Sequence, residues 1–224
     1  MSESPPELQV VVPAGPGEDS WRRLINQLPG AWPVCISAVD ERPGDLPEHI
    51  LWLRGPAGRG RQLNAGARSS RAHWLWFVHA DSVLTASALR HIASAVTDSK
   101  DVLAYLDLAF LPDGPRLSAL NALGANLRSR WLNLPYGDQG FCLPADWFRH
   151  LGGFRTDIDR GEDLDFVVRA RAAGLPLRRL PARIYTSARR YREQGWLATS
   201  WRHQVNAWRL FKAARSGTEP KATR

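Results

Sequence analysis

Cysteine and long apolar runs are scarce in this 224-residue sequence, and each scarcity excludes a class of protein. With two cysteines, Cys35 and Cys142, the chain cannot form the dense disulfide framework of a small secreted domain. Both lie in apolar stretches without a CxxC spacing, so we expect buried, reduced thiols that bind no metal. The longest strictly apolar stretches, such as 74–78, are far shorter than the roughly 20 residues of a membrane-spanning helix.

The start of the chain also lacks the pattern of a signal peptide. Glu3, Glu7, Glu18 and several prolines stand where a basic segment and an apolar core would be needed. Hydrophobic residues make up 44% of the chain and charged residues 23%, which excludes dominant disorder. We therefore expect a cytoplasmic protein with a single domain over residues 1–215, since no repeat or long linker divides the sequence, and a disordered tail over 216–224.

Basic residues outnumber acidic ones, 30 to 22, which gives a net charge of +8. Most of the excess lies near the C-terminus, because residues 189–215 contain seven basic residues and one acidic residue, or +6 of the total. A basic chain indicates an anionic partner such as a nucleic acid, a lipid surface or a phosphorylated substrate. We expect no nucleic-acid binding, since charge confined to one helix forms no basic face interleaved with aromatic residues.

The spacing of apolar residues predicts strands and helices in alternation through the first half. Strands are expected at 9–13, 34–40, 50–53, 74–78 and 102–110. Helices are expected at 19–27 with Asp19 as the cap, at 60–71, and at 85–97 with Thr85 as the cap. This alternation predicts an α/β fold with a mostly parallel central sheet and helices on both faces.

The second half has a different pattern, with helices predicted at 117–132, 145–151 and 162–173 and a short strand at 140–143. A last helix is predicted over 196–215, with an apolar stripe flanked by Arg202, Arg209 and Lys212. Either this stripe packs against the domain, or the helix lies on an anionic membrane surface with its tryptophans and arginines among the headgroups.

An imidazole and a carboxylate follow the strand predicted at 74–78. His79 and Asp81 stand at its carboxyl end, where ligands bind in open parallel sheets. Together these side chains could hold a hard divalent cation such as Mg²⁺ or Mn²⁺. The alternative is that Asp81 only caps the following turn.

Three arginines lie among glycines around the start of the helix predicted at 60–71, namely Arg54, Arg59 and Arg61. Glycines let backbone amides approach a phosphate, and both arginine and a helix N-terminus favour its negative charge. The spacing fits neither a dinucleotide-binding fingerprint nor a P-loop. A solvated, flexible loop is the alternative.

Acidic residues open the helix predicted at 162–173. The helix dipole stabilises Glu162, Asp163 and Asp165 there, and this is the simplest explanation for them. The dipole also keeps a carboxylate ionised near neutral pH, as a general base must be. Asp163 falls on the side of the helix that carries Phe166, toward the protein interior, so its burial requires a reason.

A compact polar segment, Tyr136–Gly140, precedes the strand predicted at 140–143. It places Asp138 and Gln139 between two glycines. Polar side chains in such a segment either line a site or form an ordinary turn.

Taken in order, these segments resemble the family 2 glycosyltransferases of the GT-A fold. The matching segments are Val10–Pro13, Asp40, Gly60–Gly66, His79–Asp81, Gly152–Phe154 and Glu162–Asp163. More narrowly, the chain is similar to a subgroup of small bacterial "transferase 2" proteins associated with radical-SAM (rSAM/selenodomain) proteins. The segments typical of that subgroup are His79–Asp81, Tyr136–Gln139 and Thr186–Arg190. The resemblance covers about residues 9–208.

The resemblance implies transfer of a sugar, with inversion, from a nucleotide-diphosphate donor to an acceptor hydroxyl, assisted by Mn²⁺ or Mg²⁺. The half at about 8–112 would bind the nucleotide, and the half at about 113–195 would carry the acceptor side and the catalytic residues. The residues that would lie against the nucleotide are Pro13, Ala14, Asp40, Arg61 and Asn64.

The resemblance also assigns roles to the acidic segments. Asp81 is the remaining acid of the family's Asp-x-Asp and would hold the metal, with His79 beside it. Asp163 would be the base that deprotonates the acceptor, supported by Glu162. Asp138 and Gln139 would lie on the acceptor side.

Two hypotheses follow from the sequence. The first is a metal-dependent glycosyltransferase of unknown acceptor, which the basic C-terminal helix suggests is lipid-linked or at the inner face of the membrane. The second is a catalytically impaired GT-A-like protein that binds a nucleotide or an anionic surface without turnover. Two departures from the family pattern support this second hypothesis. His79 stands where many relatives have an acid, and Glu41 follows Asp40 in place of a small glycine-serine stretch.

Overall fold

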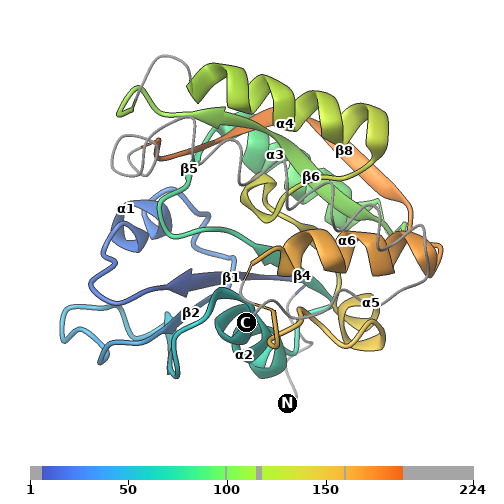
Figure 1. The fold of residues 1–224 in the computed structure, drawn as a ribbon. Helices are drawn as coiled ribbons and strands as arrows, with labels where there is room; N and C mark the ends of the chain where they lie inside the picture. The colour runs from blue at the N-terminus through green and yellow to red at the C-terminus, as the bar shows by residue number, and fades with distance from the viewer. Residues whose placement is uncertain (1–6, 99, 115–117, 159, 189–224) are drawn as a thin grey trace.

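The computed structural model describes residues 7–98, 100–114, 118–158 and 160–188 (Figure 1). Within these ranges the strands form one eight-stranded sheet in the order β3-β2-β1-β4-β7-β6-β8-β5. Its first four members run parallel: β1 (Leu8–Ala14), β2 (Val34–Ala38), β3 (Leu51–Arg54) and β4 (Trp74–Phe77). The predicted α/β fold with a mostly parallel sheet is confirmed.

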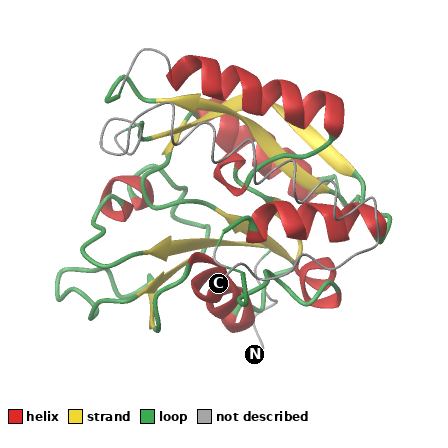
Figure 2. Cartoon of the chain, viewed as in Figure 1, coloured by secondary structure: helices red, strands yellow, loops and turns green. Residues whose placement is uncertain are grey.

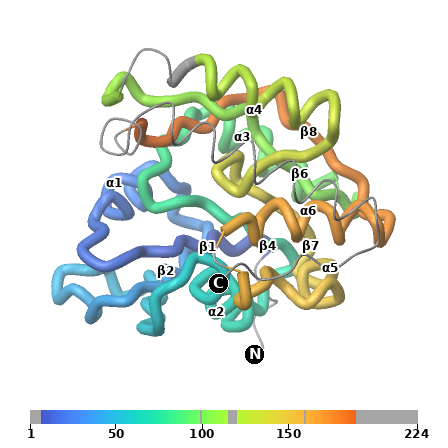
Figure 3. Tube along the Cα trace, viewed as in Figure 1, coloured from blue at the N-terminus to red at the C-terminus, as the bar shows by residue number. Residues whose placement is uncertain are grey.

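The other half of the sheet contains β5 (Val83–Leu84), β6 (Leu103–Phe110), β7 (Cys142–Pro144) and β8 (Leu177–Thr186). Strand β7 joins the two halves, because it lies between β4 and β6 and runs antiparallel to both (Figure 3). Strand β8 runs parallel to β6, and β5 pairs with it from the other side.

The sequence pattern predicts neither β5 nor β8, and this is its main error. Strand β5 has only two residues, and three arginines and Pro181 interrupt the apolar pattern of β8. Proline lacks the N–H that a ladder needs. The pairing of β6 with β8 accommodates it through a register shift, since Leu106 pairs with Leu180 and Asp107 with Arg183.

Helices cover both faces of the sheet (Figure 2). One face packs against α1 (Trp21–Ile25) and α3 (Ala86–Thr97). The other packs against α2 (Arg59–Ser69), α5 (Ala145–His150) and α6 (Glu162–Ala172). Helix α4 (Ser118–Leu132) lies across β6 and β8 (Figure 1). The predicted cover of both faces is therefore confirmed.

Alternate residues of β1 belong to the two cores, as the two-residue period of a strand requires. Val10 and Val12 contribute to the core beneath α1 and α3, whereas Val11 contributes to the core beneath α2. Gly66 allows α2 to approach the sheet closely, since a Cβ at this position would lie 2.4 Å from Cγ1 of Val11. A glycine is therefore required at this contact.

Two helix caps were predicted, and one prediction is wrong. Thr85 caps α3, where its Oγ1 accepts a hydrogen bond of 3.0 Å from the N–H of Ala88. Helix α1 instead begins at Trp21, so Ser20 rather than Asp19 occupies the cap position. Both cysteines are buried as expected, and burial raises the pKa of the Cys35 thiol to about 11.

The helix predicted over 196–215 and the tail predicted over 216–224 lie outside the described residues. Among the helices that the structure does describe, none has both the length and the hydrophobicity needed to cross a membrane. Helix α4 carries exposed apolar side chains, which are Leu120, Leu123, Leu127, Trp131 and Leu132.

Candidate active site

Segments far apart in the sequence meet beyond the end of β4. They are the residues after β4, the first turn of α2, the first turn of α6 and the 3₁₀ turn Gly137–Gln139, called here the 137–139 turn. A pocket lies among them. It is lined by Arg59, Leu63, Phe77, His79, Gly137, Phe141, Phe154, Glu162 and Asp163. The structure therefore brings His79, a predicted metal ligand, close to the predicted catalytic acids.

The first two of the three acids that open α6, Glu162 and Asp163, are buried, as was predicted for Asp163, and Arg59 compensates their charge. The Arg59 Nε–H donates to Oε1 of Glu162, and Nη2 of Arg59 lies 3.5 Å from Oδ2 of Asp163. Two buried carboxylates would be costly without such a cation. Arg59 therefore belongs to this acid pair, a contact that its position in an arginine- and glycine-rich loop does not reveal.

The carboxylate of Asp163 is surrounded by donors. Its Oδ2 accepts the backbone N–H of Gly137 at 2.8 Å, and its Oδ1 accepts the N–H of Leu164 at 2.8 Å. Burial alone would raise the pKa of Asp163. Arg59, the two N–H groups and His79 more than offset this effect, so the pKa is lowered and the group is ionised at neutral pH.

Asp138 has the opposite environment, although it lies in the same turn as Gly137. Its Oδ1 is buried and has no hydrogen-bond partner among the described residues. Burial raises the pKa of Asp138 to about 6, and the negative charge of Asp163 adds to the effect. Arg59 and Arg128 oppose it. Asp138, Glu162 and Asp163 are called here the acid cluster, in which the pKa of Asp138 is raised and that of Asp163 is lowered.

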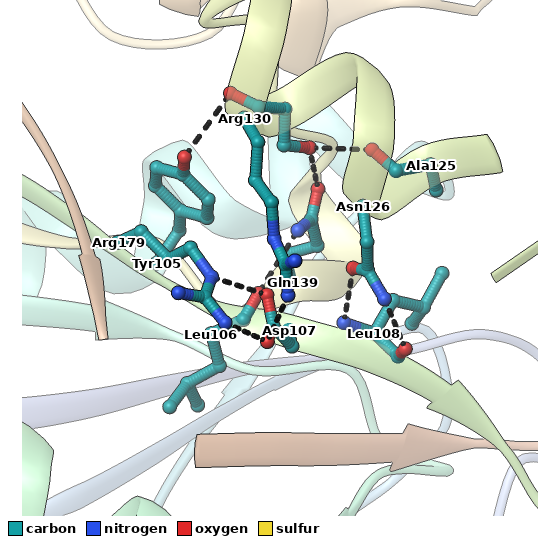
Figure 4. Close-up of polar contacts among 10 residues, drawn as sticks. Tyr105, Leu106, Asp107, Leu108, Ala125, Asn126, Arg130, Gln139 and Arg179 are labelled. Atoms are coloured by element: carbon teal, nitrogen blue, oxygen red, sulfur yellow. Dashed lines mark hydrogen bonds and ion pairs between the residues drawn. The ribbon is translucent and has the colours of Figure 1, made fainter. Parts of the chain in front are cut away.

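Gln139 is completely buried and fastens the 137–139 turn to two neighbouring elements (Figure 4). Its Oε1 accepts from the Ser129 hydroxyl of α4 at 2.7 Å and from the N–H of Tyr136 at 2.9 Å. Its Nε2 donates to the carbonyl oxygen of Leu106 in β6 at 2.9 Å. These contacts explain why an amide occupies the position, and they give Gln139 a positioning role. Its predicted place on the acceptor side stays a prediction.

An ion cluster beside Gln139 holds the same region together (Figure 4). Asp107 of β6 pairs with Arg179 of β8 through two hydrogen bonds and with Arg130 of α4 at 3.0 Å. Burial would raise the pKa of Asp107, but the two arginines lower it overall. The carboxylate therefore links three elements that frame the 137–139 turn.

The predicted nucleotide residues Pro13 and Ala14 lie at the end of β1, and Ala14 is buried. The buried side chain of Gln62 ties this strand end to its neighbour, since Nε2 donates to the carbonyl oxygens of Ala14 at 2.6 Å and Ser37 at 2.8 Å. Gln62 was not among the predicted site residues, although it stands within the matching segment Gly60–Gly66.

Asp40 and Arg61 both lie at the surface near this edge of the sheet. Oδ2 of Asp40 accepts the N–H of Gly17 at 2.7 Å, which orders the loop that follows β1. Arg54 pairs with Glu41, while Arg61 forms no ion pair with any residue that the structure describes. The predicted nucleotide contacts of Asp40 and Arg61 stay predictions.

Asn64 links α2 to the turn at 152–154. Its Nδ2 donates to the carbonyl oxygen of Phe154 at 2.7 Å, and its Oδ1 accepts the N–H of Phe154 at 2.9 Å. Gly153 has a φ of +69°, and a Cβ there would lie 2.7 Å from Oδ1 of Asn64. This contact explains why Asn64, in the matching segment Gly60–Gly66, occurs together with the matching segment Gly152–Phe154. Contact of Asn64 with a nucleotide stays a prediction.

The groups around Asp81 and His79 determine what kind of metal site these two side chains could form. Both carboxylate oxygens of Asp81 lie 3.3 Å from the Thr186 hydroxyl at the end of β8. No group of three or more His, Cys, Asp or Glu side chains within the described ranges is arranged to hold a metal ion. Mg²⁺ sites of one or two carboxylates are usually completed by substrate phosphates and water. The residues therefore fit a metal that binds together with a diphosphate, not one held by protein ligands alone.

The sequence matches no protein-family model and no curated protein. Solved structures share its fold. The mannosyltransferase PcManGT from Pyrobaculum calidifontis, in complex with GDP-Man and Mn²⁺, has a TM-score of 0.67 at 15% identity, with 99% of this chain and 67% of that one covered. TarS 1–349 from S. aureus, in complex with UDP-GlcNAc, has a TM-score of 0.61 at 13% identity, with 81% and 58% covered.

A third structure, GalNAc-T7 with UDP, GalNAc and Mn²⁺, has a TM-score of 0.61 at 12% identity, with 83% of this chain and 44% of that one covered. The chain spans 37% of the longer TarS structure that it matches. At these identities the likeness establishes the fold, which is GT-A.

Proposed function

We propose that this chain is a glycosyltransferase of the family 2 type that moves a sugar from a nucleotide-diphosphate donor to an acceptor hydroxyl, with inversion at the anomeric carbon. The observation that carries the proposal is the buried pair Glu162 and Asp163, which contact Arg59 and line the same pocket as His79. Buried carboxylates are costly to keep ionised, and such sites are enriched where proton transfer occurs. The motifs of the transferase 2 subgroup support placing the chain there.

The donor would bind along the carboxyl ends of β1 and β4. Pro13, Ala14 and Asp40 would bound the nucleoside, and Arg61 and Asn64 would lie beside the nucleotide. Asp81, with His79, would hold Mn²⁺ or Mg²⁺. A bound cation would neutralise charge on the leaving diphosphate. PcManGT and GalNAc-T7, whose structures contain Mn²⁺ with GDP-Man or UDP, support this part of the proposal.

The acid cluster would serve the acceptor. As the acceptor oxygen attacks the anomeric carbon, the bond from that carbon to the diphosphate breaks and the acceptor proton moves to a carboxylate. Glu162 and Asp163 are held in place by Arg59, and Gln139 fixes the turn that carries Asp138. Sequence reasoning favours Asp163 as the proton acceptor.

The acceptor itself is proposed to be lipid-linked, and the protein to act in the cytoplasm at the inner face of the membrane. Two features support this. Residues 196–215 combine an apolar stripe with basic residues, and α4 exposes Leu123, Leu127 and Trp131 on one side. Apolar and basic side chains together favour adsorption on anionic lipid.

A second candidate function is nucleotide binding without turnover. It is favoured by the metal-side residues, since Asp81 is the one carboxylate there and His79 accompanies it where a second acid would strengthen metal binding.

Binding of donors tests the proposal directly. The thermal midpoint of the full chain would be measured with UDP-GlcNAc, GDP-mannose and other nucleotide sugars, each with and without Mn²⁺. A ligand at a hundredfold excess over its Kd stabilises the folded state by about 2.7 kcal/mol, so a Mn²⁺-dependent rise is expected with one nucleotide base.

Substitution of Asp81 by asparagine should abolish the part of this rise that depends on Mn²⁺, because the neutral amide binds a hard cation poorly. The exposed Asp146 provides the matched control, and Asp146→Asn should keep the full shift. Absence of any shift in the folded, unaltered chain contradicts the proposal, and a Mn²⁺-dependent shift without release of nucleoside diphosphate favours the second candidate.

A further inference from the structure

We propose that Arg189 and Arg190 bind the sugar-bearing phosphate of the donor, and that Asp113 is a positioning residue that holds the chain where they can reach it. The inference rests on the proposed function and adds residues to the donor site. It gives a role to Thr186–Arg190, a segment typical of the transferase 2 subgroup.

The end of β8 lies at the same edge of the sheet as Asp81. Strands β4 and β6 both run antiparallel to β7, and β8 runs parallel to β6, so the carboxyl ends of β4 and β8 share one edge. The Thr186 hydroxyl, 3.3 Å from both carboxylate oxygens of Asp81, shows that the two ends meet there.

The strand order indicates which phosphate a group arriving from β8 would approach. The nucleoside is proposed to bind beyond β1 and β2, and β4 with Asp81 lies between those strands and β8. A side chain that follows β8 therefore comes from the side opposite the nucleoside. It would meet the second phosphate, which bears the sugar.

Asp113 fastens the residues that follow Thr186. Its Oδ2 accepts the Ser187 hydroxyl at 2.6 Å, and its Oδ1 accepts the backbone N–H of Ala188 at 2.7 Å. The carbonyl oxygen of Thr186 accepts the N–H of Leu111 at 2.9 Å. Hydrogen bonds therefore hold all three residues that precede the arginine pair.

Gly114 allows a still closer contact with the same segment. A Cβ at this position would lie 2.5 Å from both the Cβ and the carbonyl oxygen of Ala188. Ala188 is itself fully buried. Packing as well as Asp113 therefore fixes the place from which the chain continues.

Arg189 and Arg190 follow directly, outside the described residues. Three residues of chain span at most about 11 Å, so the backbone of Arg189 begins within that distance of Thr186. Thr186 in turn contacts Asp81, and an arginine side chain is long. A phosphate held beside Asp81 is therefore within reach of the arginine pair.

The arginines of the predicted phosphate-binding loop are in part committed to carboxylates. Arg54 pairs with Glu41, and Arg59 pairs with the buried acids of α6. A diphosphate carries several negative charges, and Asp81 would offset part of the charge of a bound cation. Arginine suits the remaining charge, since its planar guanidinium can donate two parallel hydrogen bonds to a phosphate.

The experiment compares a nucleoside diphosphate with the corresponding monophosphate, which lacks the phosphate that bears the sugar. Dissociation constants of both are measured calorimetrically with Mn²⁺, for the base that stabilises the full chain. The double substitution Arg189→Gln and Arg190→Gln should weaken binding of the diphosphate about 10- to 100-fold, because hydrogen bonds to a charged group are lost. Binding of the monophosphate should change by less than about threefold, because it makes no such bonds.

The exposed Arg68 and Arg149 provide the matched control. Arg68→Gln combined with Arg149→Gln removes the same two positive charges elsewhere on the surface and should change neither constant. A loss that follows net charge alone would appear in this control as well.

Asp113→Ala keeps both arginines and removes only the acceptors of Ser187 and Ala188. It should reproduce the selective loss with the diphosphate and add little to the double arginine variant, since both changes then act on one interaction. Ser187→Ala, which removes one of the two hydrogen bonds, should show a smaller loss of the same kind. Asp146→Ala, at an exposed carboxylate of α5, is the control and should change neither constant.

Thermal midpoints establish that each variant is folded. Unchanged binding of the diphosphate by the double arginine variant, equal losses with the two nucleotides, or an additive effect of Asp113→Ala would overturn the inference and leave the proposed function intact. Failure of the unaltered chain to bind any nucleoside diphosphate or nucleotide sugar would overturn both.

Discussion

Asp138 occupies a position that lowers stability when the carboxyl group is ionised. Its pKa is raised to about 6 in the folded protein, above the usual value near 4 of an unfolded chain. The folded state therefore binds the proton more tightly. The resulting cost is absent below about pH 4, grows as the pH rises toward 6 and stays constant above it.

Replacement of Asp138 by asparagine should therefore raise the free energy of unfolding at pH 8, by about 1 to 3 kcal/mol, and leave it nearly unchanged at pH 4. Urea unfolding at the two pH values measures the difference. The exposed Asp146 serves as the control, since Asp146→Asn should show no such pH dependence. Equal or lower stability of Asp138→Asn at pH 8 would contradict the environment described for this side chain.

The sequence pointed to His79, Glu162 and Asp163, which the structure places around one pocket, but their contacts could not be predicted. The inward position of Asp163 followed from helical spacing alone, and the structure confirms it. The pairing of Arg59 with Glu162 joins residues 103 positions apart, and nothing in either local pattern indicates the other. Gln139 was likewise visible only as a polar residue between two glycines, and Gln62 was not singled out, because the role of a buried amide is recognised only from the carbonyl groups around it.

Among the elements, the contact between α2 and β1 depends on the absence of a side chain. Gly66→Ala would bring a Cβ within 2.4 Å of Val11, so either the helix or the strand must shift. We expect a loss of about 1 to 3 kcal/mol in the free energy of unfolding.

Gly124→Ala is the matched control, since this glycine also lies within a helix, α4, and a Cβ there meets nothing within 4 Å. That variant should gain about 0.5 to 1 kcal/mol through helix propensity. Chemical unfolding of both variants checks the pair. Similar effects of the two substitutions would show that helix propensity, not contact with β1, governs position 66.

Elements with a continuous apolar pattern were predicted from sequence more reliably than those at the far side of the sheet. The strands near 9–13, 74–78 and 102–110 correspond to β1, β4 and β6. Strand β8 was missed because arginines and Pro181 mask its alternation, yet Leu180, Ala182 and Ile184 are all buried. Its position is fixed by pairing with β6, a long-range contact that a local pattern does not contain.

At the scale of the whole molecule, the concentration of charge near the C-terminus makes a membrane contact testable. The triple substitution of Arg202, Arg209 and Lys212 by glutamine should reduce binding to vesicles that contain phosphatidylserine by at least about tenfold, since each basic residue near an anionic surface contributes about 1 kcal/mol. Vesicle sedimentation at two salt concentrations measures the effect.

Trp131 gives the corresponding test for α4, where 79% of its surface is exposed. Trp131→Ala should weaken vesicle binding by an amount that salt does not change, because the contact is apolar. Binding by the triple variant that equals that of the unaltered chain would remove the charge-based part of the membrane proposal.

The place of β7 between β4 and β6 has a consequence for biosynthesis. Strand β4 pairs on one edge with β1, which is translated before it. The other edge of β4 pairs with β7 (Cys142–Pro144), which is translated later. Throughout the translation of the intervening residues, the Trp-Leu-Trp-Phe segment of β4 therefore has an unpaired, strongly apolar edge, of the kind that promotes association between nascent chains. Thr186, which contacts Asp81, is translated later still. The nascent chain therefore exposes this unpaired edge of β4 before the residues of the candidate site have all been translated.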